Sequence, residues 1–71
     1  MNNESNIIQL RNRRKMIIIE LAKINSPNES EEKNINLCSP ERIKEIMRFH
    51  AFESRLSEVS FAINMLGGIN D

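Results

Sequence analysis

Two stretches of the chain carry the same apolar rhythm. The first stretch has apolar residues at alternating three- and four-residue steps, namely Ile7, Leu10, Ile17, Leu21 and Ile24, with Arg14 at the one missing step. The second stretch repeats this spacing without interruption at Phe49, Phe52, Leu56, Val59, Ile63 and Leu66. Apolar residues at this period form a stripe on one side of an α-helix, which packs against another helix. The pattern therefore predicts an all-α fold, an antiparallel two-helix hairpin.

Local signals set the expected boundaries of these helices. Pro27, in a run of polar residues, ends the first helix, and the pair Gly67-Gly68 ends the second. Ser39 is the expected N-cap of the second helix, with Pro40 at its first helical position. The 71-residue chain is thus one small helical domain with a first helix over 6–25, a polar connection over 26–38 and a second helix over 40–66.

Further apolar residues lie beside the two stripes. They are Ile8, Met16, Ile18 and Ile19 in the first helix, and Ile43, Ile46, Met47, Phe61, Ala62 and Met65 in the second. A core of this size supplies only a few kcal/mol, and Cys38, the single cysteine, cannot form an internal disulfide. We therefore expect self-association, as a homodimer, or a protein partner to complete a helical bundle. The alternative is a compact monomer in which the connection covers the flanking residues.

Charge is balanced overall but concentrated locally. The chain has a net charge of zero, yet Arg11, Arg13, Arg14 and Lys15 form a dense basic cluster. Several cations on one helix can bind phosphates in a salt-sensitive manner, which makes a nucleic-acid-binding helical dimer an alternative function. The cluster has no aromatic neighbours for base stacking, so a solvated face that pairs with acidic residues is the favoured interpretation.

Arg14 is the sharper anomaly, because it replaces a core residue in the middle of the first stripe. A buried charge is costly unless it is paired, and Glu53 or Glu58 of the second helix could reach it. The favoured alternative is that its stem is buried while its charged end extends to solvent.

Catalytic chemistry has little support in the sequence. His50 is the only histidine, so a pair with Cys38 is the one conceivable nucleophile–base arrangement, and there is no glycine-rich phosphate loop. We expect no enzyme activity, no cofactor, no metal and no small-molecule substrate. The polar residues 1–6 do not resemble a secretory signal, and the apolar run over 16–19, followed by Leu21 and Ala22, is too short to span a membrane. A cytoplasmic protein without a membrane partner is expected.

Two segments of the chain resemble the Hha/YmoA group of small bacterial gene-expression modulators. Residues 8–14, which read Ile-Gln-Leu-Arg-Asn-Arg-Arg, are similar to the basic first segment of that group. Residues 55–60, Arg-Leu-Ser-Glu-Val-Ser, resemble its central stretch, although the family's acid–His–Arg triplet here reads Glu53-Ser54-Arg55. The resemblance implies a helical protein that docks on the nucleoid protein H-NS, with Glu53 and Arg55 as interface residues.

Two further resemblances lead to other functions. Residues 10–23 resemble the first helix of the sporulation aspartyl-phosphate phosphatases, which implies a phosphatase acting on a response regulator. Glu53 and Ser57 stand where the serine and aspartate of that family's second-helix motif should be, which removes the acid thought to direct the reaction. The Pro40-Glu41 start and the long second helix look like the helical hairpins of type III secretion, both needle subunits and co-chaperones.

Taken together, these patterns favour a non-enzymatic protein-interaction module. It would regulate or assemble a larger partner through a helix surface, as a modulator of gene expression if the first resemblance holds. The expected partner-binding residues are Arg14, Met47, Glu53, Arg55, Phe61 and Met65.

Overall fold

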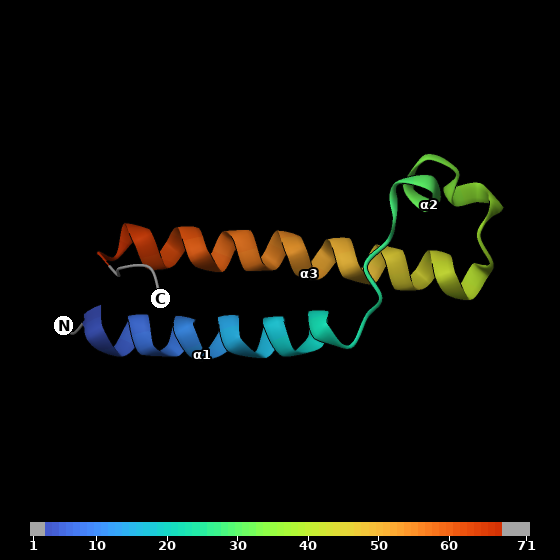
Figure 1. Cartoon of the computed structure of the whole chain (residues 1–71). Coiled ribbons are helices and arrows are strands. Elements are labelled where there is room, and N and C mark those ends of the chain that lie inside the picture. Colours follow the sequence, from blue (N-terminus) through green and yellow to red (C-terminus); the bar gives the residue numbers. More distant parts are fainter. Residues whose placement is uncertain (1–2, 68–71) are drawn as a thin grey trace.

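The computed structural model describes residues 3–67, and this part of the chain is helical and contains no strand. Its elements are α1 (Asn3–Ala22), α2 (Glu29–Lys33), the 3-10 turn η1 (Ile35–Leu37) and α3 (Pro40–Met65). The two long helices run side by side in opposite directions, as Figure 1 shows. The predicted all-α class and the hairpin of two long helices are therefore confirmed.

The hairpin is held together by the two apolar stripes. Ile17 of α1 and Val59 and Ile63 of α3 form the buried centre of the contact, and Ile63 is only 1% exposed. Half-buried residues of the same stripes pack around this centre, namely Ile7, Leu10, Leu21, Phe52 and Leu56. The three-four spacing therefore placed one face of each helix against the other, as expected for helix pairing.

The start of α3 follows its sequence signals. Ser39 is the N-cap, and its hydroxyl accepts a hydrogen bond from the Arg42 backbone N–H at 3.1 Å. Pro40 occupies the first helical position, where the missing N–H costs nothing. At the other end α3 stops at Met65, and Gly67 adopts a φ of +85°, which favours glycine. Gly68, the second glycine of the predicted stop, lies outside the described residues.

The first helix is shifted from its predicted bounds. The sequence predicted a helix over 6–25, whereas α1 covers Asn3–Ala22. The backbone N–H groups of Lys23 and Ile24 bond to carbonyls three residues back, at 3.1 Å each. This tighter turn ends α1 before the polar run that precedes Pro27, and it explains why the predicted end was too late.

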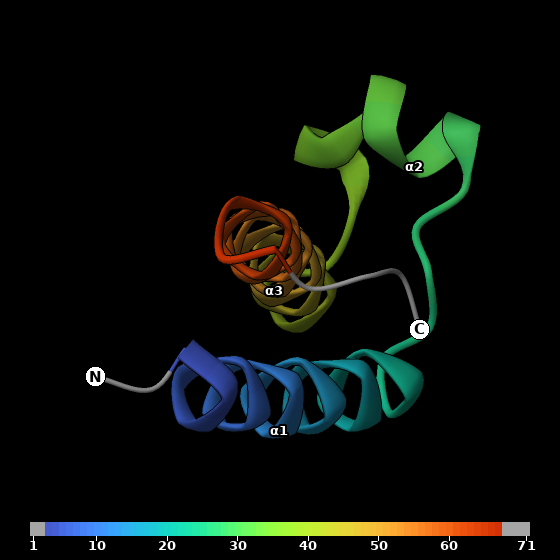
Figure 2. The ribbon, with the colours of Figure 1, turned by 90° about the vertical axis from the view of Figure 1, so that its left-hand side faces the viewer.

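The connection is more ordered than the predicted polar linker over 26–38. Asn28 accepts a hydrogen bond from the Glu31 backbone N–H at 2.8 Å, and the Glu31 carboxylate accepts one from the Asn28 backbone N–H at 3.1 Å. This reciprocal capping box starts α2, although none of its residues is buried. Figures 1 and 2 show α2 and η1 folded back beside the first half of α3.

This placement matches the difference in length between the long helices. At 1.5 Å per residue α3 is about 39 Å long and α1 about 30 Å, so α3 extends beyond its partner. Ile46, which was predicted to flank the main stripe, is instead buried at 1% exposure. It lies three residues before Phe49 and thus continues the stripe toward the start of α3. The connection runs beside this end of the helix (Figure 1).

Replacing Ile63 should show how much the hairpin depends on its seam. Ile63→Ala should lower the free energy of unfolding by about 2–4 kcal/mol, because it removes buried apolar atoms and leaves a cavity. Ile19→Ala, at a position that is 44% exposed, is the control and should change it by less than about 1 kcal/mol. Urea unfolding at one fixed protein concentration measures both, and Ile63→Val serves if the alanine variant does not fold. Equal losses at positions 63 and 19 would contradict this assignment of the core.

Candidate partner-binding surfaces

The side of α3 that faces away from α1 carries an exposed stripe, which we call the α3 outer face. Its apolar members are highly exposed, with Met47 at 63%, Phe61 at 66% and Met65 at 70%. Three smaller or polar exposed residues complete the stripe at the same helical spacing: Ala51, Ser54 and Glu58. Because Val59 and Ile63 already face α1, a two-helix hairpin leaves this stripe uncovered.

The exposed side of α1 carries a second apolar surface, which we call the α1 groove. Ile8, Ile18 and Ile19 line it and are between 44% and 55% exposed. Its remaining lining residues are Arg11, Asn12, Arg14 and Lys15, so no acidic side chain is among the described residues that line it. The groove therefore combines aliphatic surface with positive charge.

The structure separates the four members of the basic cluster. Arg11, Arg14 and Lys15 line the α1 groove, whereas Arg13 lies on the other side of α1 in a groove shared with Arg55 and Glu58 of α3. Arg14 is half-buried on the stripe that faces α3, and it still reaches the edge of the α1 groove. Three of the four predicted cations thus share one surface.

The predicted contact residues of α3 lie on different sides of the helix. Glu53 approaches His50, with 3.4 Å between the carboxylate Oε1 and the ring Nδ1. Arg55 is exposed, and its guanidinium carbon lies 6.0 Å from the centre of the Phe52 ring, which Arg48 also approaches at 5.9 Å. Only Met47, Phe61 and Met65 of the predicted contact set share the α3 outer face.

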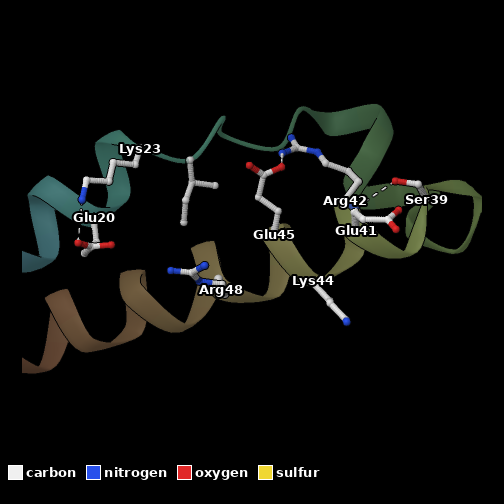
Figure 3. A pocket seen from close by; sticks show the side chains of 9 residues that line it. Glu20, Lys23, Ser39, Glu41, Arg42, Lys44, Glu45 and Arg48 are labelled. Carbon is white, nitrogen blue, oxygen red and sulfur yellow. Dashed lines mark hydrogen bonds and ion pairs between the residues drawn. The ribbon is translucent and has the colours of Figure 1, made fainter.

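Arg42 forms an ionic centre that the sequence patterns did not reveal. Its guanidinium donates two hydrogen bonds to the Glu31 carboxylate, at 2.7 and 2.8 Å, and one to Glu45 at 2.7 Å. It also donates to the backbone carbonyl of Asn25 at 3.1 Å. The Arg42 side chain is only 18% exposed, and it ties the connection to the first turn of α3. Figure 3 shows Arg42 and Glu45 side by side in the groove that leads to the end of α1.

These contacts shift the pKa values of Glu31 and Arg42. The hydrogen bonds from Arg42 and from the Asn28 backbone lower the pKa of Glu31 to about 2. The hydrogen bonds to Glu31 and Glu45 raise the pKa of Arg42 above its ordinary value, with Glu31 as the larger cause. The carboxylate of Glu31 therefore stabilises the docked connection above its ordinary pKa, near 4.5, and this contribution is lost only as the pH falls toward 2.

His50 makes a second link between the connection and α3. Its Nε2 lies 2.6 Å from the Glu32 carboxylate, and its ring packs edge-on against Phe49. The hydrogen bond to Glu32 raises the pKa of His50, with the nearby charge of Glu53 as a smaller cause. Cys38 and His50, the one conceivable nucleophile–base arrangement in the sequence, each have other partners: Cys38 donates a weak hydrogen bond to the Asn34 carbonyl, with 3.9 Å between Sγ and O, and His50 lies beside the carboxylates of Glu32 and Glu53.

A further groove, shown in Figure 3, is lined by residues from the end of α1, the turn that follows it and the first half of α3. Its lining residues carry both signs of charge, and they include two ion pairs: Lys23 with Glu20 at 3.2 Å and Arg42 with Glu45 at 2.7 Å. Within the described residues, no three His, Cys, Asp or Glu side chains are grouped as a metal site. None of the helices described here has the length and apolar character needed to cross a membrane.

In comparisons with known proteins, no family model, curated protein or solved structure matches this chain. The resemblances drawn from short motifs therefore stay predictions. The features of the molecule that bear on function are the two exposed surfaces, the α3 outer face and the α1 groove.

The link between His50 and Glu32 can be tested by a proton NMR titration, because His50 is the only histidine. We expect its pKa to lie above the ordinary value of 6.5, and to move back toward it in Glu32→Gln, which removes the largest cause of the shift. Glu29→Gln is the control, since Glu29 pairs with Lys33 in the same helix, at 2.9 Å.

The raised pKa of His50 also predicts how the docking of the connection on α3 depends on pH. A raised pKa means that the bond stabilises the docked connection fully below pH 6.5 and is lost as the pH rises through the folded-state pKa. Amide exchange over residues 29–37, corrected for the intrinsic effect of pH, should therefore become faster with rising pH in the native chain but not in Glu32→Gln. An unshifted His50 would contradict the contact.

Proposed function

We propose that this chain is a non-enzymatic protein-interaction module that regulates or assembles a partner through its exposed helix faces. The observation that carries the proposal is the α3 outer face, on which Met47, Phe61 and Met65 are each more than 60% exposed on one side of a regular helix. Burying a side chain of this size gains about 1.5–3 kcal/mol, so a protein that covers the stripe gains several kcal/mol. Large apolar side chains gathered on one side are typical of a binding surface.

The small number of buried residues in the hairpin supports the same proposal. Among the described residues only Ile17, Ile46, Val59 and Ile63 are buried, whereas nine large apolar residues are exposed, including four on α1 and three on α3. Such a chain gains additional burial by binding to another protein surface. A role as a modulator of gene expression would follow if that surface belonged to a nucleoid protein, with Arg55 exposed for contact and Glu53 engaged by His50.

A nucleic-acid-binding helical dimer is the second candidate, and one observation favours it. Arg11, Arg14 and Lys15 line a single groove of α1. The isoleucines between them suit an apolar partner better than a phosphate backbone, and Arg13 lies on the opposite side. The protein-interaction proposal therefore accounts for more of the surface.

The main proposal predicts that association depends on the exposed apolar faces. Light scattering over a dilution series, with circular dichroism on the same samples, should show assembly of the native chain or, with a candidate protein, a complex. We call the chain that carries Ile18→Lys, Ile19→Lys, Phe61→Lys and Met65→Lys the four-lysine chain. It should lose self-assembly and binding to the candidate protein but keep its helical signal, because four charged side chains cannot be buried unpaired. Full association of this variant would overturn the proposal, as would the absence of any association by the native chain.

The salt dependence of binding distinguishes the second candidate, a nucleic-acid-binding helical dimer, from the protein-interaction module. If the basic cluster binds DNA or RNA through phosphates, affinity should fall steeply between low and moderate salt, and Lys15→Gln should reduce the slope by about one. Lys33→Gln, a charge change on α2 away from the groove, should leave the slope unchanged. Retention of a mixed-sequence duplex that does not respond to salt, or no retention at low salt, would exclude this function.

A further inference from the structure

The spacing of the residues on the α3 outer face is the same in both directions along the helix. Its six residues follow one another at steps of four, three, four, three and four. Each residue of the first half has a counterpart equally far from position 56 in the second half. These counterparts are Met47 with Met65, Ala51 with Phe61, and Ser54 with Glu58. A stripe with this symmetry can pair with a copy of itself turned end to end.

We propose, building on the interaction function above, that the occupant of the α3 outer face is a second copy of this chain. The two α3 helices would lie antiparallel, related by a twofold axis that passes beside position 56. Each contact then occurs twice, as in any isologous dimer. The two α1 helices would lie on the outside, so the four long helices would form a row with the α3 pair at its centre.

The paired side chains complement each other in size and chemistry. The Phe61 ring of one copy would lie against the small Ala51 of the other, which leaves room for it, and Met47 would meet the flexible Met65. Both apolar contacts lie toward the ends of the stripe. At the centre, the Ser54 hydroxyl of one copy can donate a hydrogen bond to the Glu58 carboxylate of the other. All six residues are exposed in the single chain and therefore available for these contacts.

Charge favours the antiparallel direction over the parallel one. Arg55 and Glu58 line the same side of α3, and within the described residues neither takes part in an ion pair. In the antiparallel register, position 54 of one helix faces position 58 of the other, so Arg55 lies one residue from the facing Glu58. A parallel pair would instead place Glu58 against Glu58. Opposite charges at an interface set orientation more than affinity.

Charge also indicates that α1 is not the self-interface. The α1 groove contains three cationic side chains and no acidic one among its described lining residues. With two such grooves facing each other, no lining carboxylate of one copy would be available to pair with Lys15 of the other. The α2 segment folds beside α3 but leaves Met47 63% exposed, so the connection does not cover the proposed contact.

Sedimentation equilibrium of the full chain tests the proposal with a matched pair of variants. Met65→Lys should raise the dimer dissociation constant by more than about tenfold, because it places a charge in the apolar contact. Met16→Lys, at an exposed methionine of α1, is the control and should change it less than about twofold. Circular dichroism should show native helix content for both variants.

Each other outcome has a defined meaning. A native chain that stays monomeric at every concentration overturns the proposal, as does a dimer that Met16→Lys disrupts and Met65→Lys leaves intact. In either case the function proposed above survives if association with another protein is still lost in the four-lysine chain. Both proposals are overturned if the native chain associates neither with itself nor with another protein.

Disulfide trapping tests the direction of the pair. In a Cys38→Ser background, chains with Ser54→Cys and Glu58→Cys are mixed, one of them carrying an added tag so that the products differ in mass. The antiparallel register predicts that the mixed disulfide forms first, since positions 54 and 58 face each other. Like-with-like disulfides at position 54 as the main product would indicate parallel helices and overturn the register.

Discussion

A pair of helices can bury only one stripe of each member, and this geometric limit governs the whole molecule. The stripes of α1 and α3 meet around Ile17, Val59 and Ile63, and that contact holds the two long helices together. Every other apolar residue has to be covered by the connection or left exposed. The structure does both, since Ile46 is buried near the connection whereas Met47, one residue later, faces solvent.

The connection compensates for the unequal lengths of the helices. A segment with no buried residue cannot dock by apolar packing, so α2 is held by charged contacts instead. Arg42 bonds to Glu31 in the two-point geometry of a planar guanidinium, and it also donates a hydrogen bond to the backbone carbonyl of Asn25, in the segment that follows α1. His50 adds a further, titratable contact to Glu32. The protein is therefore held together by an apolar contact between the stripes of α1 and α3 and by the ionic contacts of Arg42 and His50 with α2, which we call the ionic joint.

Much of this fold could be predicted from the sequence, because helix pairing is encoded in a simple period. The stripes, the hairpin and the Ser39 cap all follow from local spacing and local hydrogen bonding. The α2 helix was missed because a periodicity search cannot detect a five-residue helix without an apolar face. Asn28 followed three residues later by Glu31 was the available signal. The pair between Arg42 and Glu31 depends on the chain folding back on itself, which no local pattern encodes.

The ionic joint also bears on the order of folding. The capping box of α2 closes within four residues, and the pair between Arg42 and Glu31 spans only 11. By contrast, Ile17 and Ile63 are far apart in the sequence, so bringing them together from an extended chain carries a larger entropic cost. A connection that is already folded shortens the effective loop between the two long helices. The charged α2 segment, in which no residue is itself buried, would thereby speed the encounter of the apolar stripes.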